Sequence, residues 1–109
     1  MEACLGYITC GSREEAERIA RALLEKRLIA CANILDGLLS LYRWEGELAR
    51  DREALLLVKT RRPLVDEVIR TVRAQHSYEC PCITFLPLVA GDAAYLAWVD
   101  QETGGEGRG

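Results

Sequence analysis

Two long extended stretches joined by a short turn dominate the middle of this chain. Residues 30–44 and 47–60 are separated only by Glu45-Gly46. Glycine readily adopts turn conformations, so this arrangement predicts one long β-hairpin. The pair Asp36-Gly37 inside the first stretch is a second turn pattern. It predicts either a division into two short strands or, as we favour, a β-bulge at Gly37.

The first 28 residues have the pattern of a strand followed by an amphipathic helix. Residues 3–10 are rich in apolar and β-favouring types and stop at Gly11, as a short buried strand does. Ser12 and Glu15 have the spacing of a capping box, which predicts that a helix begins there. The apolar stripe expected to pack on a sheet consists of Ala16, Ile19, Ala20, Leu23, Leu24 and Leu28.

The second half of the chain repeats this order and adds a terminal helix. Pro63 suits the first turn of a second helix that ends near His76, and residues 82–89 form a fourth expected strand. Asp92 is the expected N-cap of the last helix. The buried stripe of the second helix is Val65, Val68, Ile69 and Val72, and the last helix carries Tyr95, Leu96, Trp98 and Val99.

The order β-α-β-β-α-β with a C-terminal helix predicts an α+β fold of the ferredoxin-like, split β-α-β type. With 109 residues there is room for one domain, expected over residues 1–103, and residues 104–109 are expected to form a flexible tail. Both helices would cover one sheet face and leave the other bare. Residues 38–44 and 55–60 are too apolar for a sheet that exposes one face to water. The hairpin is therefore expected to cover the bare sheet face of a neighbouring subunit in a homo-oligomer.

Charge and composition exclude several classes of partner. The net charge of −3 and a sequence pI near 5.2 argue against nucleic acid. The beginning of the sequence lacks a basic signal-peptide region, and no apolar run reaches the roughly 20 residues that span a bilayer. These features predict a cytoplasmic protein with no membrane partner. Its five cysteines, an odd number, are expected to be free thiols in that reducing compartment.

A single histidine lies close to two cysteines and is the best candidate for metal chemistry. His76 is followed by Cys80 and Cys82, whose side chains point to one face if the segment is extended. Thiolate and imidazole ligands suit Cu(I), Zn²⁺ or a similar soft ion. The alternative is that His76 packs at a helix C-terminus while both cysteines fill space. Thiol exchange by this cysteine pair is a third interpretation.

The sequence offers little support for an enzymatic function. There is no Gly-x-Ser-x-Gly pattern, no phosphate-cradling glycine loop and one histidine to serve a nucleophile. We therefore expect a binding protein and not an enzyme.

Several segments, taken together, resemble the divalent-cation tolerance (CutA) family. They are residues 15–20 (EAERIA), 28–34 (LIACANI), 42–47 (YRWEGE), 55–60 (LLLVKT) and 95–98 (YLAW). The resemblance implies a ferredoxin-like subunit assembled into a trimer through its long hairpin, an architecture shared with the PII signalling proteins. It also implies a connection with copper or other divalent metal ions.

The resemblance implies further site residues. Cys31 matches a family cysteine and becomes a secondary metal candidate, although packing is the commoner role of such a thiol. A cleft between subunits, which would take a small anion or metabolite, is implied for Trp44, Glu45, Lys59, Tyr78 and Glu79. The alternative is that the aromatic residues supply interface area and that Lys59 forms an ion pair with a glutamate.

The sequence departs from the family pattern after the second helix. Residues 76–83 read HSYECPCI, where the family usually has His-Pro-Tyr-Glu followed by one apolar residue and Pro-Glu-Ile. A site that depends on the later glutamate would therefore be altered, because Cys82 replaces it here.

Overall fold

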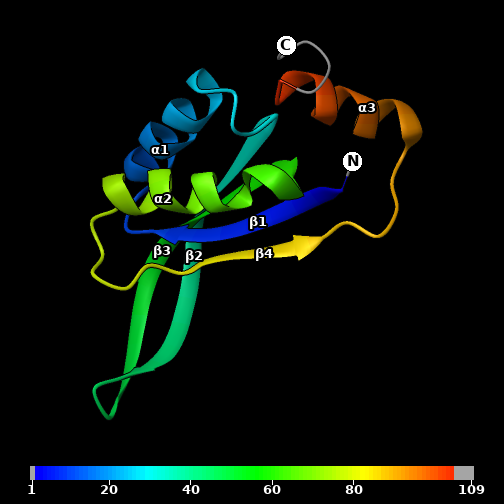
Figure 1. Ribbon diagram of the computed structural model, residues 1–109. Coiled ribbons are helices and arrows are strands. Elements are labelled where there is room, and N and C mark those ends of the chain that lie inside the picture. The colour runs from blue at the N-terminus through cyan, green and yellow to red at the C-terminus, as the bar shows by residue number, and fades with distance from the viewer. Residues whose placement is uncertain (1, 105–109) are drawn as a thin grey trace.

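The computed structural model describes residues 2–104 and has the predicted order of elements (Figure 1). The strands are β1 (Ala3–Cys10), β2 (Cys31–Trp44), β3 (Glu47–Arg61) and β4 (Ile83–Pro87). The helices are α1 (Arg13–Glu25), α2 (Val65–Gln75) and α3 (Ala93–Glu102), and a 3₁₀ turn, Arg62–Leu64, precedes α2. Most of the predicted tail lies outside the described residues; Gly104 is still described, and its N–H donates to the Gln101 carbonyl at 3.1 Å.

The four strands form one antiparallel sheet in the order β2-β3-β1-β4. Strand β3 lies between β1 and β2, which therefore run parallel and are connected by α1. This is the split β-α-β connection of the ferredoxin-like fold, and the predicted α+β class is confirmed. The register places Ile8 between Leu56 on one side and Ile83 on the other.

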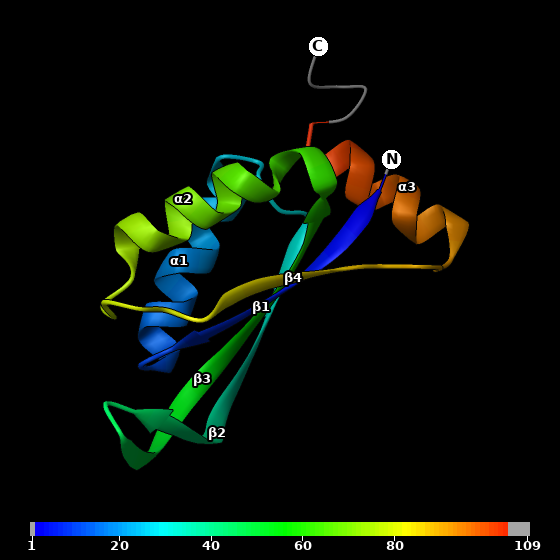
Figure 2. The ribbon, with the colours of Figure 1, turned by 60° about the horizontal axis from the view of Figure 1, so that its bottom comes forward.

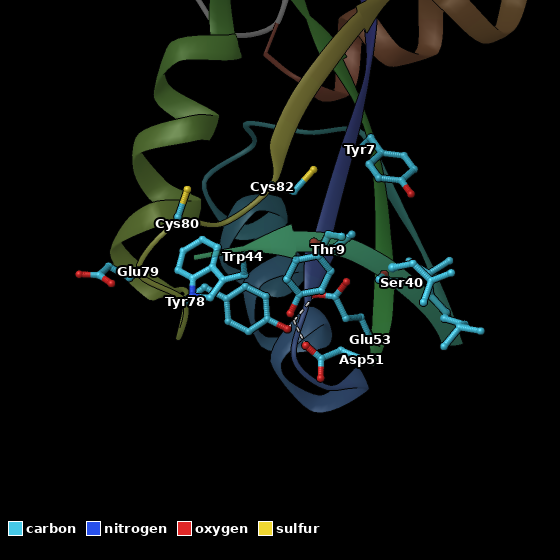
Figure 3. A pocket seen from close by; sticks show the side chains of 14 residues that line it. Tyr7, Thr9, Ser40, Trp44, Asp51, Glu53, Tyr78, Glu79, Cys80 and Cys82 are labelled. Carbon is cyan, nitrogen blue, oxygen red and sulfur yellow. Dashed lines mark hydrogen bonds between the residues drawn. The ribbon is translucent and has the colours of Figure 1, made fainter. Parts of the chain in front are cut away.

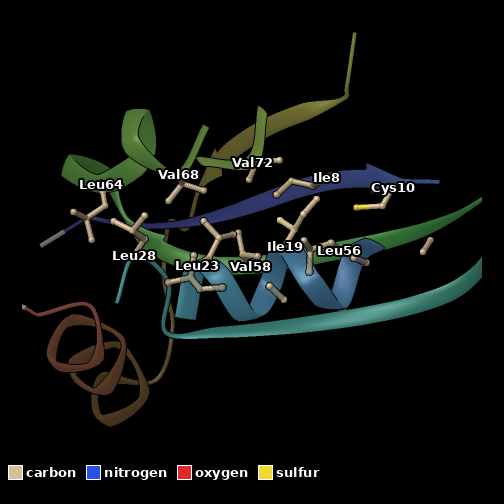
Figure 4. Close-up of a cluster of buried hydrophobic side chains, with 14 residues drawn as sticks. Ile8, Cys10, Ile19, Leu23, Leu28, Leu56, Val58, Leu64, Val68 and Val72 are labelled. Atoms are coloured by element: carbon tan, nitrogen blue, oxygen red, sulfur yellow. The ribbon is translucent and has the colours of Figure 1, made fainter. Parts of the chain in front are cut away.

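The hydrophobic core lies between the sheet and the helices α1 and α2, which cover the same face (Figures 1 and 4). Even-numbered residues of β1 and β3, such as Ile8, Leu56 and Val58, point into this layer and are fully buried. They meet Ile19 and Leu23 of α1, and α2 adds Val68 and Val72. The alternation of side chains along a strand therefore assigns one residue in two to the core.

The predicted start of α1 is confirmed, whereas the end of α1 and the start of α2 differ from the prediction. Ser12 accepts a hydrogen bond from the Glu15 N–H at 3.1 Å, as predicted for the N-cap of α1. Leu24 is 40% exposed, so its place in the buried stripe was wrong. Leu28 is buried but lies beyond the helix, because α1 ends at Glu25 and Arg27 has a positive φ of 58°. Pro63 lies in the 3₁₀ turn and not in α2 itself.

The last strand and helix agree with the prediction in place but not in length. β4 is shorter than the predicted strand 82–89, and Val89 is almost fully exposed beyond its end. The Asp92 carboxylate accepts from the Tyr95 N–H at 3.0 Å and caps α3 as predicted.

The hairpin β2–β3 contains the predicted bulge and extends beyond the rest of the domain (Figures 1 and 2). Pairing shifts by one residue between Leu35 and Leu38, and Gly37 has the positive φ of 75° that favours glycine. The Asp36 carboxylate accepts from the Gly37 N–H at 2.8 Å and stabilises the bulge. Two short strands in place of β2 are therefore excluded.

We call the sheet face opposite α1 and α2 the open face. Helix α3 lies at one end of it, where Arg61 donates to the Thr103 hydroxyl at 2.9 Å and approaches Asp100 at 3.6 Å. The rest of this face and the hairpin carry exposed apolar side chains, including Leu35 (62% exposed), Leu41 (65%) and Leu48 (76%). Within residues 2–104, no helix has the length and apolar character needed to cross a membrane.

Candidate functional site

A groove of about 730 Å³ lies on the open face, between the far part of the hairpin and the loop that precedes β4 (Figure 3). Its walls come from β1, β2, β3 and the loop. The lining residues are Tyr7, Thr9, Leu38, Leu39, Ser40, Leu41, Tyr42, Trp44, Asp51, Glu53, Tyr78, Glu79, Cys80 and Cys82.

The bulge determines which hairpin residues face this groove. Before it, Leu35 pairs with Leu55 on the open face; after it, Leu38 pairs with Glu53 and Ser40 with Asp51. The extra residue in β2 moves even-numbered side chains onto the face that odd-numbered ones occupy before the bulge. Tyr42 and Trp44 therefore lie on the same face as the two acidic residues of β3.

Two tyrosine–carboxylate pairs line the groove. The Tyr78 hydroxyl donates to Glu53 Oε2 at 2.8 Å, and the Tyr42 hydroxyl donates to Asp51. Burial, and then the hydrogen bond to Glu53, raises the pKa of Tyr78 well above its ordinary range. The bond to Asp51 raises the pKa of Tyr42. Both phenols therefore remain protonated donors at neutral pH, facing carboxylate acceptors.

The predicted ligand His76 is buried behind this groove and does not point into it. Its Nε2 lies 2.7 Å from the Thr9 carbonyl, and its Nδ1 accepts from the Tyr78 N–H at 3.1 Å. Because a carbonyl can only accept, the proton lies on Nε2 and the ring is neutral. His76 is the C-cap residue that follows α2, so its ring packs at the C-terminus of that helix. Cys80 and Cys82 are exposed and do not fill space in the way that the same alternative expected of them.

Glu15 joins the end of β1 to the segment after α2. Its Oε1 accepts from the Gly11 N–H at 2.8 Å and its Oε2 from the Ser77 N–H at 2.7 Å. The expected capping-box bond would have gone to the Ser12 N–H; the carboxylate reaches one residue further. Burial raises the pKa of Glu15, but the hydrogen bonds from Gly11 and Ser77 outweigh burial and hold that pKa below its ordinary value.

The structure brings His76 together with Cys10 and Glu15 instead of the predicted cysteines. One potential ligand atom from each of these three residues lies within 4.8 Å of the others, and they are the sole such group of three among residues 2–104. The set His76, Cys80 and Cys82 is thus not assembled in this conformation. Cys10 is not indicated by the sequence, because only the fold brings it together with His76.

The Cys10 cluster fits a metal ion poorly. Burial, followed by the charges of Glu15 and Glu53, raises the pKa of the Cys10 thiol to about 12, so the thiolate that binds metals is scarce. Both nitrogens of His76 and both oxygens of Glu15 already hold hydrogen bonds. Cys80 and Cys82, in contrast, are exposed thiols that line the groove.

The five residues implied for an intersubunit cleft separate into two regions of the chain. Trp44, Tyr78 and Glu79 line the groove, and Glu45 forms the adjacent hairpin turn with a φ of 50°. Lys59 lies elsewhere. It pairs in register with Cys31, its Nζ is 3.9 Å from the Cys31 sulfur, and it lies 5.7 Å from the centre of the Tyr95 ring.

Cys31 is therefore part of a second cluster under α3. Its sulfur is 3.3 Å from the Tyr95 hydroxyl, and that contact, followed by burial, raises the pKa of Tyr95. The predicted secondary metal ligand is remote from Cys80 and Cys82, because β3 carries Lys59 about 20 Å beyond Glu53.

The fold and the site define a small ferredoxin-like domain with a groove on its open sheet face. Comparison with known sequences identifies it further: the family described as CutA1 divalent ion tolerance protein matches residues 4–102. The chain belongs to this family. The family is named for tolerance of divalent ions and not for a reaction that it catalyses.

Individual relatives support the same assignment. The chain is 47% identical over 97 residues to the divalent-cation tolerance protein CutA of Thermus thermophilus, covering 89% of this chain and 94% of that protein. It is 40% identical to human Protein CutA, also over 89% of this chain but only 54% of the longer human protein. The T. thermophilus structure has a TM-score of 0.90 at 44% identity, with 92% and 97% of the two chains covered.

A further solved structure concerns the cellular compartment of a relative. The Archaeoglobus fulgidus protein, described as a periplasmic divalent cation tolerance protein CutA, has a TM-score of 0.90 at 44% identity, covering 93% of this chain and 98% of that one.

Proposed function

We propose that this protein is a cytoplasmic, non-enzymatic trimer that binds copper or another soft or divalent metal ion as part of a response to metal. The observation that carries the metal proposal is the pair of exposed thiols, Cys80 and Cys82, that flank Pro81 at one groove. Thiolates are preferred ligands of Cu(I) and Zn²⁺. Membership of a divalent ion tolerance family supports the same role.

Cys80 and Cys82 would be the first ligands, because both thiols are exposed and line the same groove. His76 could join them only by giving up its bonds to the Thr9 carbonyl and the Tyr78 N–H. Cys31 would act separately, beside Lys59 and Tyr95.

Removing both groove thiols should abolish tight metal binding. We expect Cys80→Ser/Cys82→Ser to weaken Cu(I) binding at least about 100-fold, since losing outer partners of a metal ligand alone typically costs 10–100-fold. Anaerobic titration with Cu(I) and Zn²⁺, followed by thiolate-to-metal charge-transfer absorption and chelator competition, measures this.

The control is Cys31→Ser, which keeps both groove thiols and should retain the tight site. Unchanged Cu(I) affinity in the double variant would exclude Cys80 and Cys82 as ligands. Adding His76→Asn to each protein then tests whether the histidine contributes.

The trimer proposal rests on apolar surface that a monomer exposes to water. Leu35, Leu41 and Leu48 are each more than 60% exposed on the hairpin. Such surface is typical of an interface. We propose that each hairpin covers the open face of a neighbouring copy and that three copies close the ring, as the resemblance implied.

A charge on the hairpin should separate the subunits. Sedimentation velocity should give a trimer for the unaltered protein and a smaller species for Leu41→Asp, because the interface would have to bury a carboxylate without a partner. Leu24→Asp adds the same charge at an exposed leucine of α1 and should remain trimeric. A wild-type protein that sediments as a monomer would overturn the proposed assembly.

A second candidate function is a PII-like scaffold that binds a small metabolite. The observation in its favour is the groove itself, whose volume of about 730 Å³ is within the range of small-molecule sites. A thermal-shift screen of small metabolites tests it, because a ligand that binds the folded protein raises its apparent stability.

A further inference from the structure

We infer that neighbouring copies of this chain meet through opposite faces of their hairpins, with a basic face of one copy lying against the acidic groove of the next. This inference rests on the proposed trimer, and it specifies which surfaces meet there. Arginines of one copy would then complete the groove of its neighbour.

Beyond the bulge, the hairpin has a second face, opposite the groove, which we call the reverse face. Residues paired across an antiparallel ladder share a face, and successive pairs alternate between the two faces. The pairs of the reverse face are Leu39 with Arg52, Leu41 with Arg50, and Arg43 with Leu48. The arginines and Leu48 do not line the groove, whereas Leu39 and Leu41 also border it from the outer strand of the sheet.

The three arginines of the reverse face have no acidic partner within the chain. Among residues 2–104, no carboxylate oxygen lies within 4.0 Å of a nitrogen of Arg43, Arg50 or Arg52. All three side chains are exposed, and Arg52 donates to the Gly37 carbonyl at 3.4 Å. The reverse face therefore offers guanidinium groups to carboxylates outside its own chain.

The groove has the opposite charge. Asp51, Glu53 and Glu79 line it, and none of its lining residues is a lysine or arginine. Asp51 and Glu53 each accept a hydrogen bond from a neutral tyrosine hydroxyl, which leaves the charge of the carboxylate in place. Because a carboxylate has sites for several donors, an arginine of another copy can bind beside the tyrosine.

Apolar surface accompanies the charge on both faces. Leu41 and Leu48 of the reverse face are largely exposed, because the hairpin extends beyond α1 and α2 (Figures 1 and 2). On the groove side, Tyr42 and Trp44 are also exposed. Contact between the two faces would bury aromatic and leucine side chains and pair the charges around them.

The arrangement of the two faces favours a ring over a two-fold dimer. A two-fold axis brings the same surface of both copies together, which would set acid against acid or base against base. The two faces are back to back on one hairpin, so a copy cannot offer both to the same partner. A contact between unlike faces leaves one face of each copy for a further copy, and it closes only in a ring.

Sedimentation velocity over a dilution series measures the dissociation constant of the trimer. We expect that constant to rise between about 0.05 and 0.5 M NaCl, because salt screens the charges that pair. Arg43→Gln/Arg50→Gln/Arg52→Gln should raise it about 30-fold at low salt, since a loss of roughly threefold at each of three identical interfaces multiplies. This variant should also lose most of the salt dependence.

The control Arg13→Gln/Arg70→Gln/Arg73→Gln removes the same charge from exposed positions on α1 and α2, and it should assemble like the unaltered protein. Asp51→Asn/Glu79→Gln neutralises the other side of the contact. Combined with the hairpin arginine variant, it should weaken the trimer by clearly less than the product of the two separate effects, because both remove the same pairs.

The outcomes separate this inference from the proposed trimer. A trimer that is insensitive to salt would overturn the inference and leave the trimer standing, and so would strictly multiplicative effects of the arginine and acidic variants. Equal weakening by the hairpin and control arginine variants would mean general charge repulsion and would also overturn it. A monomeric unaltered protein would remove both.

Discussion

Glu15→Gln should lower the free energy of unfolding by about 2–4 kcal/mol, although the substitution preserves the shape of the side chain. The carboxylate accepts from the N–H groups of Gly11 and Ser77, one at each oxygen. A glutamine keeps one acceptor and turns an NH₂ group towards the other donor. Urea unfolding at pH 7 measures the difference.

The loss should depend on pH in a direction set by the lowered pKa of Glu15. A carboxyl whose pKa is lower in the folded state contributes its full stability above the unfolded value, about 4.3 for glutamate. That contribution is lost as the pH falls through the folded value. The stability gap between the two proteins should therefore be constant near neutrality and narrow in acid, below about pH 4.3.

Glu14→Gln provides the control, because Glu14 is exposed in the same turn of α1 and its contact is a 3.7 Å approach to Arg13. We expect it to change stability by less than about 0.5 kcal/mol. A similar stability for Glu15→Gln and Glu14→Gln would show that the Glu15 carboxylate does not join β1 to the segment after α2 in solution.

Gly6→Val should destabilise the domain by more than about 3 kcal/mol, at the upper end of the range for overpacked cores. A Cβ atom at Gly6 would lie 2.6 Å from both a ring carbon of Phe85 and a methyl group of Val58. Both belong to neighbouring strands of the sheet, so neither can move far. Leu5→Val, one residue away on the open face, controls for a β-branched residue in this strand.

A double-mutant cycle locates the cause of the strain. Phe85→Leu removes one of the two obstructing groups, so Gly6→Ala should cost less in that background than in the unaltered protein, by at least about 0.5 kcal/mol. Chemical denaturation of the four proteins measures the coupling. Strict additivity of the two changes would contradict the proposed contact between position 6 and the Phe85 ring.

Local features of the chain were predictable because their causes are close in sequence. The Ser12 and Asp92 caps each involve an N–H three residues away, and the Gly37 bulge follows from the backbone freedom of one residue. The long hairpin needed only its two stretches and the Glu45-Gly46 turn. These features led to the correct α+β arrangement.

The site was less predictable because it depends on contacts between distant segments. His76 stands near Cys80 and Cys82 in sequence, yet its ring bonds to Thr9, 67 residues away, and so turns towards Cys10 and Glu15. The role of Glu53 depends on the loop before β4, which brings the Tyr78 hydroxyl to its carboxylate. Ser40, Tyr42 and Trp44 are spaced two residues apart in β2, and this spacing indicates that they share one face of the strand beyond the bulge.

The extra residue at Asp36-Gly37 divides β2 into two parts with different structural roles. Before it, Ala32 and Ile34 are tied to the packing of α1; beyond it, the inward and outward positions exchange parity. Substitutions near the tip can therefore remodel the groove while the core keeps its composition. The residues of β2 that line the groove and the residues of β2 that pack in the core therefore lie in separate halves of the strand.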